Sequence, residues 1–419
     1  FSIMSLRTTS NGILSTHVTW EEVEENLRNA FKTDARFGPK KSAKHIGQGS
    51  GFLSRIALIT CDWTGNSEGL PDKIALKLAS CLAAAEVEAQ TQLENPEESW
   101  AFFEQFLKRT HNHECFAYNF FESFEEDLRI PKKYYSIAFD DEHPLTGQLA
   151  LQFIDNATAH ADLSVENVKE IARELGKLGA LSALYGIEKI DEFENANVYT
   201  QFFGNISLDL IDKMLGALSQ IEPTENMKTA VAQILQLLPK YFGTNLPETI
   251  CDQMGIKKTL VHGDLWSSNV LFDTEDGHLR SILDWQMLHS GIGVEDITRI
   301  ALSGMLTNER RSHMKDILDV MYDSLEENMD GERPPYTREQ MHEIYEILLP
   351  HCAFFFIPVV LPNVYAMLKD PNASNVKERK SIVMGKVLGI LEDIIEYDKI
   401  NEKRPKLQFK DPNFAARQT

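Results

Sequence analysis

Three side chains that carry oxygen atoms stand at the spacing of a phosphoryl-transfer centre. One stretch, from residue 262, reads His-Gly-Asp-Leu-Trp-Ser-Ser-Asn-Val-Leu-Phe-Asp, and a later one, from residue 282, reads Ile-Leu-Asp-Trp-Gln. Phosphoryl transfer uses a carboxylate that orients the attacking hydroxyl, and an amide with a second carboxylate that hold Mg²⁺ against nucleotide phosphates. The spacing therefore predicts Asp264 as the catalytic base, and Asn269 and Asp284 as catalytic residues that bind the metal.

An ordinary turn is the alternative interpretation, because Asp and Asn favour turns through local hydrogen bonds. The flanking sequence favours a larger assembly. Residues 259–261, 270–272 and 281–283 are apolar runs typical of buried strands. The turn residues between the last two strands are Asp273, Asp276 and Gly277.

This segment resembles the catalytic loop of the aminoglycoside phosphotransferase and choline kinase superfamily. Its Asp-Trp-Gln form, followed by a Gly-containing stretch and Glu-Asp-Ile-Thr-Arg-Ile, is most similar to the CHK-kinase-like, or ecdysteroid-kinase-like, family. The resemblance implies an α+β fold of the bilobal protein-kinase-like type, with a small sheet-rich N-lobe and a larger helical C-lobe. It also implies that ATP and Mg²⁺ are the cofactors.

A kinase-type site needs a glycine-rich hairpin over the nucleotide phosphates. Residues 46–56 read Ile-Gly-Gln-Gly-Ser-Gly-Phe-Leu-Ser-Arg-Ile. Glycines let the backbone approach phosphate oxygens without a side chain in the way, although a plain hairpin would have the same composition. The residues that we expect to bind the nucleotide here are Gly47, Gly49, Ser50, Gly51 and Phe52.

The same site needs a lysine on a neighbouring strand. The run Lys-Ile-Ala-Leu-Lys-Leu-Ala at 73–79 alternates like a strand and follows the glycines by about thirty residues. Lys77 occupies the position of the phosphate-binding lysine. Lys73 is the competing candidate, but it stands at the entrance of the strand, after Pro71 and Asp72.

A helix carboxylate should hold that lysine, and Glu114 is the residue we expect. Residues 100–121 are typical of a long helix, and the sequence around Glu114 resembles the family's pattern of a Glu followed by an aromatic pair. The rival interpretation is a metal cluster of His111, His113 and Cys115. In a helix, however, His111 and His113 point to opposite sides.

The adenine should meet backbone groups of the chain between the lobes. The apolar strand at 147–155 ends in Asp155-Asn156, so the Gln152 carbonyl and the Ile154 amide are the expected contacts. Family members often have Glu where Gln152 stands, and His where Gly179 stands. A backbone contact tolerates the first difference.

The same patterns predict the organisation of the chain. We expect a nucleotide-binding lobe at residues 1–152 and a catalytic and substrate-binding lobe at residues 153–419. An amphipathic helix is expected near 20–31, a long one from Ser164, and two more at 206–221 and 226–242. Helices are also expected to dominate residues 295–397.

Composition limits the partners. The 419 residues carry a formal charge of −21, which repels phosphate backbones, so nucleic acid and anionic membranes are not expected partners. No apolar run is long enough to span a bilayer, and no secretory leader is evident at the start of the sequence. The five cysteines, scattered and odd in number, fit reduced thiols in the cytoplasm.

A small molecule is the expected acceptor. Protein kinases place a long activation segment after the metal-binding Asp, whereas here only residues 285–295 separate Asp284 from Asp296. Asp296 is expected to bond the catalytic-loop backbone, and His262 to pack the loop. The function expected is an ATP-dependent phosphotransferase acting on a hydroxyl of a lipophilic alcohol, steroid or glycoside. The alternatives are a pseudokinase that binds nucleotide or metabolite without catalysis, and an atypical protein kinase.

Overall fold

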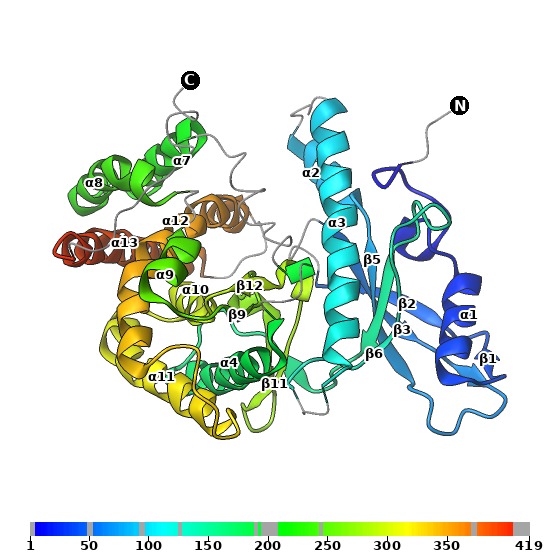
Figure 1. The fold of residues 1–419 in the computed structure, drawn as a ribbon. Coiled ribbons are helices and arrows are strands. Elements are labelled where there is room, and N and C mark those ends of the chain that lie inside the picture. Colours follow the sequence, from blue (N-terminus) through cyan, green and yellow to red (C-terminus); the bar gives the residue numbers. More distant parts are fainter. Residues whose placement is uncertain are drawn as a thin grey trace. The chain divides into compact units, whose positions relative to one another are not determined.

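The computed structural model describes residues 5–47, 53–91, 97–124, 128–187, 192–193, 208–242, 246–369 and 375–404 (Figure 1). The chain forms two compact units. The N-terminal unit comprises Phe1–Ala157, Asp273–Glu275 and Arg280–Gln286, and the C-terminal unit comprises Thr158–Phe272, Asp276–Leu279 and Met287–Thr419. A sheet dominates the first unit and helices dominate the second, which confirms the expected fold class.

The N-terminal unit is built on a five-stranded antiparallel sheet with the order β2-β3-β5-β7-β6. Its strands are β2 (Ser42–Ile46), β3 (Ser54–Thr60), β5 (Lys73–Ala79), β6 (Lys133–Ile137) and β7 (Gln148–Gln152). β5 matches the strand predicted from alternation. Ile74, Leu76 and Leu78 are buried on one of its faces, and Lys77 belongs to the opposite face.

Two helices pack on this sheet. α1 (Trp20–Phe31) is the predicted amphipathic helix, and it begins at a capping box formed by Thr19 and Glu22. Val23 and Leu27 of α1 join the core on the Leu76 face of the sheet. α3 (Glu97–Phe121) starts slightly earlier than predicted and carries Glu114. Figure 1 shows the sheet between these two helices. Lys77 faces α3, because its ammonium contacts Glu114 of that helix.

Short elements complete the N-terminal unit and supply the strands of the second. In the N-terminal unit these are η1 (Ile13–Ser15), β1 (Arg36–Phe37), β4 (Trp63–Thr64) and α2 (Leu82–Thr91). The first two residues of η4 (Trp285–Met287) also belong to this unit, and Met287 belongs to the other. The C-terminal unit has β9 (Thr259–Val261), η3 (Ser267–Asn269) and β12 (His289–Gly291), and β9 pairs antiparallel with β12. The chain passes from one unit to the other within β8 (Ala157–Thr158), β10 (Val270–Asp273) and β11 (Leu279–Ile282). The three strands predicted around the catalytic loop are therefore confirmed as β9, β10 and β11.

Helices form most of the C-terminal unit. They are α4 (Val165–Tyr185), α7 (Leu208–Ile221), α8 (Glu225–Tyr241), α9 (Leu246–Met254), α10 (Val294–Gly304), α11 (Thr307–Glu327), α12 (Arg338–Lys369) and α13 (Val376–Asn401). The helices predicted from Ser164, at 206–221, at 226–242 and across 295–397 are confirmed. Ser164 is the N-cap of α4 and forms a capping box with Asn167. None of the helices in the described part of the chain has the length and apolar character needed to cross a bilayer.

The close packing of α4 against α11 depends on Gly176. A Cβ atom at this position would stand 2.4 Å from the Met321 carbonyl oxygen and 2.8 Å from the Leu325 amide nitrogen. Ser324 of α11 also donates a hydrogen bond to the Arg173 carbonyl of α4, at 2.7 Å. Only a glycine lets the two backbones approach this closely.

Candidate active site

The N-terminal unit brings Lys77, Glu114 and Asp284 together, although they are far apart in the sequence. The Lys77 ammonium lies 2.7 Å from Glu114 Oε2 and 2.6 Å from Asp284 Oδ1. β5 supplies the lysine, α3 supplies the glutamate, and the segment after β11 supplies the aspartate. The Glu114 side chain is 1% exposed and that of Asp284 is 28% exposed, so the glutamate is internal and the aspartate is accessible to a ligand.

Two carboxylates facing one ammonium leave this cluster with a negative charge when all three groups are ionised. Burial alone would lower the pKa of Lys77, but Asp284 and Glu114 outweigh burial and raise it, so the lysine stays charged. Burial raises the pKa of Glu114 to about 7, against the attraction of Lys77. The excess negative charge favours the arrival of a cation at Asp284.

Asp284 is held in an uncommon backbone conformation, with φ at 68°. The next residue, Trp285, is buried, its indole N–H donates to the Ile282 carbonyl at 3.1 Å, and its ring packs edge-on against Phe121 of α3. Glu114 also accepts a hydrogen bond from the Trp285 backbone. α3 therefore fixes the lysine and the backbone beside Asp284 at the same time.

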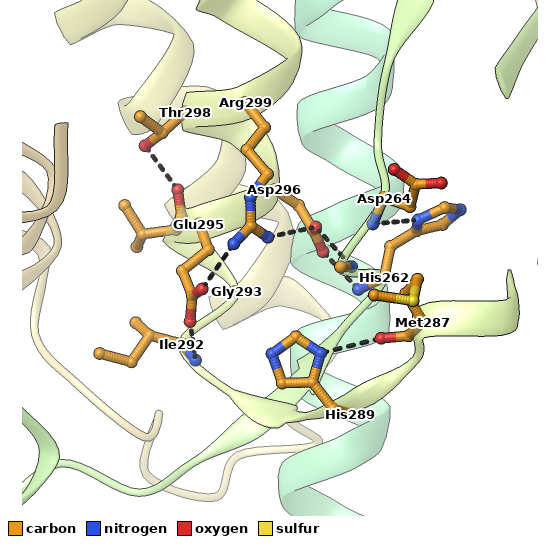
Figure 2. A network of polar contacts seen from close by, with 12 residues as sticks. His262, Asp264, Met287, His289, Ile292, Gly293, Glu295, Asp296, Thr298 and Arg299 are labelled. Carbon is orange, nitrogen blue, oxygen red and sulfur yellow. Dashed lines mark hydrogen bonds and ion pairs between the residues drawn. The ribbon is translucent and has the colours of Figure 1, made fainter. Parts of the chain in front are cut away.

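In the C-terminal unit, Asp296 of α10 holds the loop that carries Asp264 (Figure 2). Asp296 Oδ2 accepts from the His262 amide at 2.6 Å, and Oδ1 accepts from the Gly263 amide at 3.0 Å. Gly263 has φ at 84°, and a Cβ there would stand 2.4 Å from the Met287 carbonyl oxygen. The loop conformation thus requires both the glycine and the buried carboxylate, which is the role that the sequence indicated for Asp296.

Behind Asp296 lies a buried ionic network. Arg299 Nη2 lies 3.0 Å from Glu295 Oε2, and Arg299 Nη1 lies 3.8 Å from Asp296 Oδ1. Burial raises the pKa of Asp296 to about 7, whereas Arg299 and the two loop amides lower it. His262 is also buried, and its Nδ1 accepts a hydrogen bond from the Asp264 amide at 3.2 Å (Figure 2). This contact gives His262 the structural position expected for it.

Asp264 and Asn269 lie at the two ends of the loop and contact each other. Asn269 Nδ2 donates to the Asp264 carbonyl at 2.8 Å, so the amide nitrogen is used inside the loop and the oxygen is the atom that would bind a cation. The amide oxygen of Asn269 and the carboxylate of Asp284 are hard oxygen donors, the type that Mg²⁺ prefers. The ligand chemistry predicted from the sequence therefore fits this cation.

Trp266 is a residue of this loop that the sequence did not single out. Its indole N–H donates a short hydrogen bond to Asp264 Oδ1, and its ring centroid lies 5.5 Å from that of Phe356 on α12. The only signal in the sequence was its place in the His-Gly-Asp-Leu-Trp string. Nothing in the string shows that the indole reaches back to the carboxylate.

The structure describes only some of the other residues predicted to bind the nucleotide. Gly47 has a positive φ of 66°, as a glycine hairpin requires, while Gly49, Ser50, Gly51 and Phe52 lie outside the described residues. Gln152 ends β7 opposite Ile74 of β5, and Ile154 follows two residues later, half-buried. Their contact with adenine stays a prediction.

The rival candidates have partners elsewhere. Lys73 is exposed and lies 2.5 Å from Asp155. His111 is buried, with its Nε2 2.9 Å from the Ile137 carbonyl and 3.5 Å from Cys115 Sγ, and burial lowers its pKa to about 4. The contact with Ile137 holds β6 against α3, so the histidine has a structural use there.

The fold is similar to that of a solved choline kinase. The choline kinase structure from Cryptosporidium parvum Iowa II aligns with a TM-score of 0.51, 10% sequence identity, and coverage of 95% of this chain and 99% of that chain. At this identity the likeness shows the fold alone.

The chain belongs to the DUF1679 family, which matches residues 6–402 and carries the description "Uncharacterized oxidoreductase dhs-27". This is a kinase-like family of the ecdysteroid-kinase-like group, which confirms the resemblance seen in the sequence. The word oxidoreductase in this description belongs to a longer protein, of which the match with this chain covers 34%. The N-terminal sheet is antiparallel, unlike the parallel sheet of a dinucleotide-binding fold.

Two relatives from Caenorhabditis elegans match parts of the chain. The "Uncharacterized kinase-like protein D1044.1" is 26% identical over 153 residues, which are 34% of this chain and 39% of that protein. The "Uncharacterized oxidoreductase dhs-27" is 24% identical over 287 residues, which are 66% of this chain and 34% of that protein. The chain thus spans between a third and two fifths of the length of these curated relatives.

Proposed function

We propose that this protein is an ATP-dependent phosphotransferase that acts on a hydroxyl group of a small molecule. The single observation that carries the proposal is the contact of Lys77 with both Glu114 and Asp284. A lysine fixed by a helix carboxylate, next to a carboxylate suited to Mg²⁺, is the arrangement with which kinases bind nucleotide phosphates. A purely structural ion pair would not need the second, accessible carboxylate.

Each residue has a defined role in this mechanism. Lys77 binds the nucleotide phosphates and Glu114 orients Lys77. Asn269 and Asp284 would hold Mg²⁺, which would offset the negative charge of the transferred group. Asp264 accepts the hydroxyl proton while the acceptor oxygen bonds to the γ-phosphorus. The bond between that phosphorus and the β–γ bridging oxygen breaks, and ADP leaves with the electron pair. The nucleotide lobe is proposed as residues 1–152 and the catalytic lobe as residues 153–419.

The acceptor is a small molecule because the chain offers little room for a peptide platform. After Asp284 the chain forms η4 and β12, and α10 already begins at Val294. The α12 segment proposed to face the acceptor reads Leu-Leu-Pro-His-Cys-Ala-Phe-Phe-Phe-Ile from residue 348. Phe354 and Phe355 are buried in the core, and Phe356 is only partly buried beside Trp266. An uncharged aromatic surface suits a lipophilic alcohol, a steroid or a hydrophobic glycoside.

A screen for ATP-dependent mass gain tests the proposal. Purified protein, ATP and Mg²⁺ are incubated with a metabolite extract, and products heavier by one phosphoryl group are sought by mass spectrometry. A parallel reaction with radiolabelled ATP shows whether label enters a small molecule or protein. A labelled small product supports the proposal. Labelled protein would favour a protein kinase, and nucleotide binding without any product would favour a pseudokinase.

The identity of the products tests the acceptor class separately. Products confined to choline, ethanolamine or amino sugars would overturn the lipophilic acceptor and leave the phosphotransferase standing.

We place the protein in the cytoplasm, since its five cysteines are free and buried, and burial raises the pKa of each thiol to about 12.

A further inference from the structure

The loop around Asp264 brings an aromatic N–H donor to the proposed catalytic carboxylate. Trp266 has extended backbone angles, φ −111° and ψ 161°. Its side chain reaches back to that of Asp264, two residues earlier, as the hydrogen bond between them shows. Leu265 between them is completely buried and anchors the segment. Asp264 and Trp266 are both partly buried and can meet a ligand together.

The Trp266 ring also belongs to an aromatic surface. Its indole N–H is committed to Asp264 Oδ1, and this charge-assisted bond restricts the rotation of both side chains. The ring centroid lies 5.5 Å from that of Phe356, with the two planes tilted by 33°. One partly buried pair of rings therefore lies beside the carboxylate that has to meet the acceptor hydroxyl.

The α12 segment beside these rings adds no negative charge that would attract a cationic acceptor. The α12 residues from 348 to 357 carry no acidic or basic side chain other than His351. Burial lowers the pKa of His351 to about 3, so this ring is neutral. A quaternary ammonium group is recognised by a cage of several aromatic rings. Here the carboxylate beside the rings is that of Asp264, which accepts a hydrogen bond from the Trp266 indole. In the proposed mechanism this carboxylate also accepts the proton of the acceptor hydroxyl.

We propose that Trp266 is a positioning and specificity residue of the phosphotransferase. Its indole N–H orients the Asp264 carboxylate toward the acceptor hydroxyl, and its ring, with that of Phe356, forms the surface on which the uncharged carbon skeleton of the acceptor lies. This inference rests on the proposed function for its catalytic part. The hydrogen bond itself is testable without any activity.

The first experiment observes the indole N–H groups of the full-length protein by NMR after labelling with ¹⁵N-tryptophan. The chain has five tryptophans, and the Trp266→Phe variant identifies the Trp266 resonance by its loss. Asp264→Asn replaces a charged acceptor by a neutral one, so this resonance should move upfield. The Trp63 resonance, identified with Trp63→Phe, is the matched control, because that indole donates to the Pro71 carbonyl at 2.8 Å. A Trp266 resonance that Asp264→Asn leaves in place would overturn the inference.

The second experiment separates turnover from acceptor binding. Trp266→Phe keeps an aromatic ring and loses the donor, so kcat should fall roughly tenfold or more while the acceptor KM changes little. Phe356→Leu removes part of the ring surface, so the acceptor KM should rise roughly two- to tenfold with kcat retained. Phe31→Leu, which removes a partly buried ring packed on Tyr134 in the N-terminal unit, should change neither constant.

The outcomes distinguish this inference from the function on which it rests. A wild-type protein that transfers no phosphoryl group contradicts the proposed function, while the indole resonance still decides whether the hydrogen bond exists. If the wild-type protein transfers the phosphoryl group and Trp266→Phe has the same kcat, the role proposed for Trp266 is contradicted and the proposed function stands. Equal efficiency with a quaternary-ammonium alcohol and an apolar alcohol would overturn the assigned acceptor surface.

Discussion

Lys77 is the residue on which the site in the N-terminal unit depends, because its ammonium contacts two carboxylates from separate parts of the chain. Lys73, four residues earlier on the same strand, is 46% exposed at its side chain and pairs with Asp155 at the surface. The two lysines have the same chemistry and differ in their surroundings. They therefore form a matched pair for mutagenesis.

We expect Lys77→Ala to weaken ATP binding at least tenfold and Lys73→Ala to leave it within about twofold. A buried charge-assisted contact to phosphate is worth roughly 1.5–3 kcal/mol, whereas an exposed ion pair contributes little. Isothermal titration calorimetry with ATP and Mg²⁺ measures both affinities. If Lys73→Ala lost its affinity for ATP and Lys77→Ala retained it, the wrong lysine would have been assigned.

Asp284→Ala should abolish the metal-dependent transfer of the γ-phosphate. The carboxylate is the expected ligand of Mg²⁺, and without it the repulsion around the transferred group is not offset. The measurement is phosphoryl transfer with Mg²⁺, with Mn²⁺ and with chelator, for wild type and variant. Near wild-type turnover in Asp284→Ala would contradict the assignment of the active site.

Asp264→Asn should lower kcat by roughly 10² to 10⁴, the usual contribution of a positioned general base, with little change in ATP affinity. Single-turnover kinetics and calorimetry on the same preparation separate the two effects. A variant that loses ATP affinity in proportion to its turnover would show that Asp264 acts in binding and not in proton transfer.

At the scale of the elements, α4 and α11 depend on a backbone approach that only glycine allows. A methyl group at position 176 would stand 2.4 Å from a carbonyl oxygen of α11, which cannot move without its helix. Gly216 of α7 offers the control, since a Cβ there has no atom within 4 Å among the described residues. The two substitutions are chemically identical and differ only in the space available.

Gly176→Ala should lower the free energy of unfolding by roughly 1–3 kcal/mol, the usual cost of overpacking a core. Gly216→Ala should raise it by roughly 0.5–1 kcal/mol, because alanine loses less backbone entropy in a helix. Chemical denaturation followed by circular dichroism measures both. Equal stability of the two variants would show that α11 shifts freely away from α4.

At the scale of the whole molecule, several buried groups link folding to pH in opposite senses. Burial lowers the pKa of His111 and His289 to about 4 and of His351 to about 3, from 6.5. The unfolded chain binds protons to these rings before the folded protein does, so each destabilises the fold as pH falls below about 6.5. Glu114 and Asp296, whose pKa burial raises to about 7, act in the opposite sense, since the folded protein then binds the proton first.

A single substitution isolates one of these contributions. His351 Nδ1 donates to the Tyr241 carbonyl at 3.0 Å, and glutamine can donate there without titrating. Between pH 7 and pH 5, wild type should lose about 2 kcal/mol more of its unfolding free energy than His351→Gln. Urea denaturation of both proteins at the two pH values gives the difference. Equal losses would show that His351 is protonated in the folded protein.

The sequence by itself determined the local elements and the chemistry of the loop. Alternation predicted β5, the amphipathic pattern predicted α1, and three-four spacing after Ser164 predicted α4. The apolar residues that flank the His-Gly-Asp string predicted the strands around Asp264. These signals are local, because each depends on residues within a few positions of one another. The same string also indicated the family, which residues 6–402 match.

Only the tertiary structure decided which partners these residues have. Lys73 and Lys77 look alike in the sequence, and the contact of Lys77 with Asp284 joins residues 207 positions apart. Phe356 lies among three consecutive phenylalanines, and Trp266 beside a buried leucine, so no pattern predicted that their rings would meet. Contacts of this kind depend on how helices and strands pack, and packing depends on volumes across the whole core. For this reason the sequence determined the residue types of the candidate site, and the fold decided which of them contact one another.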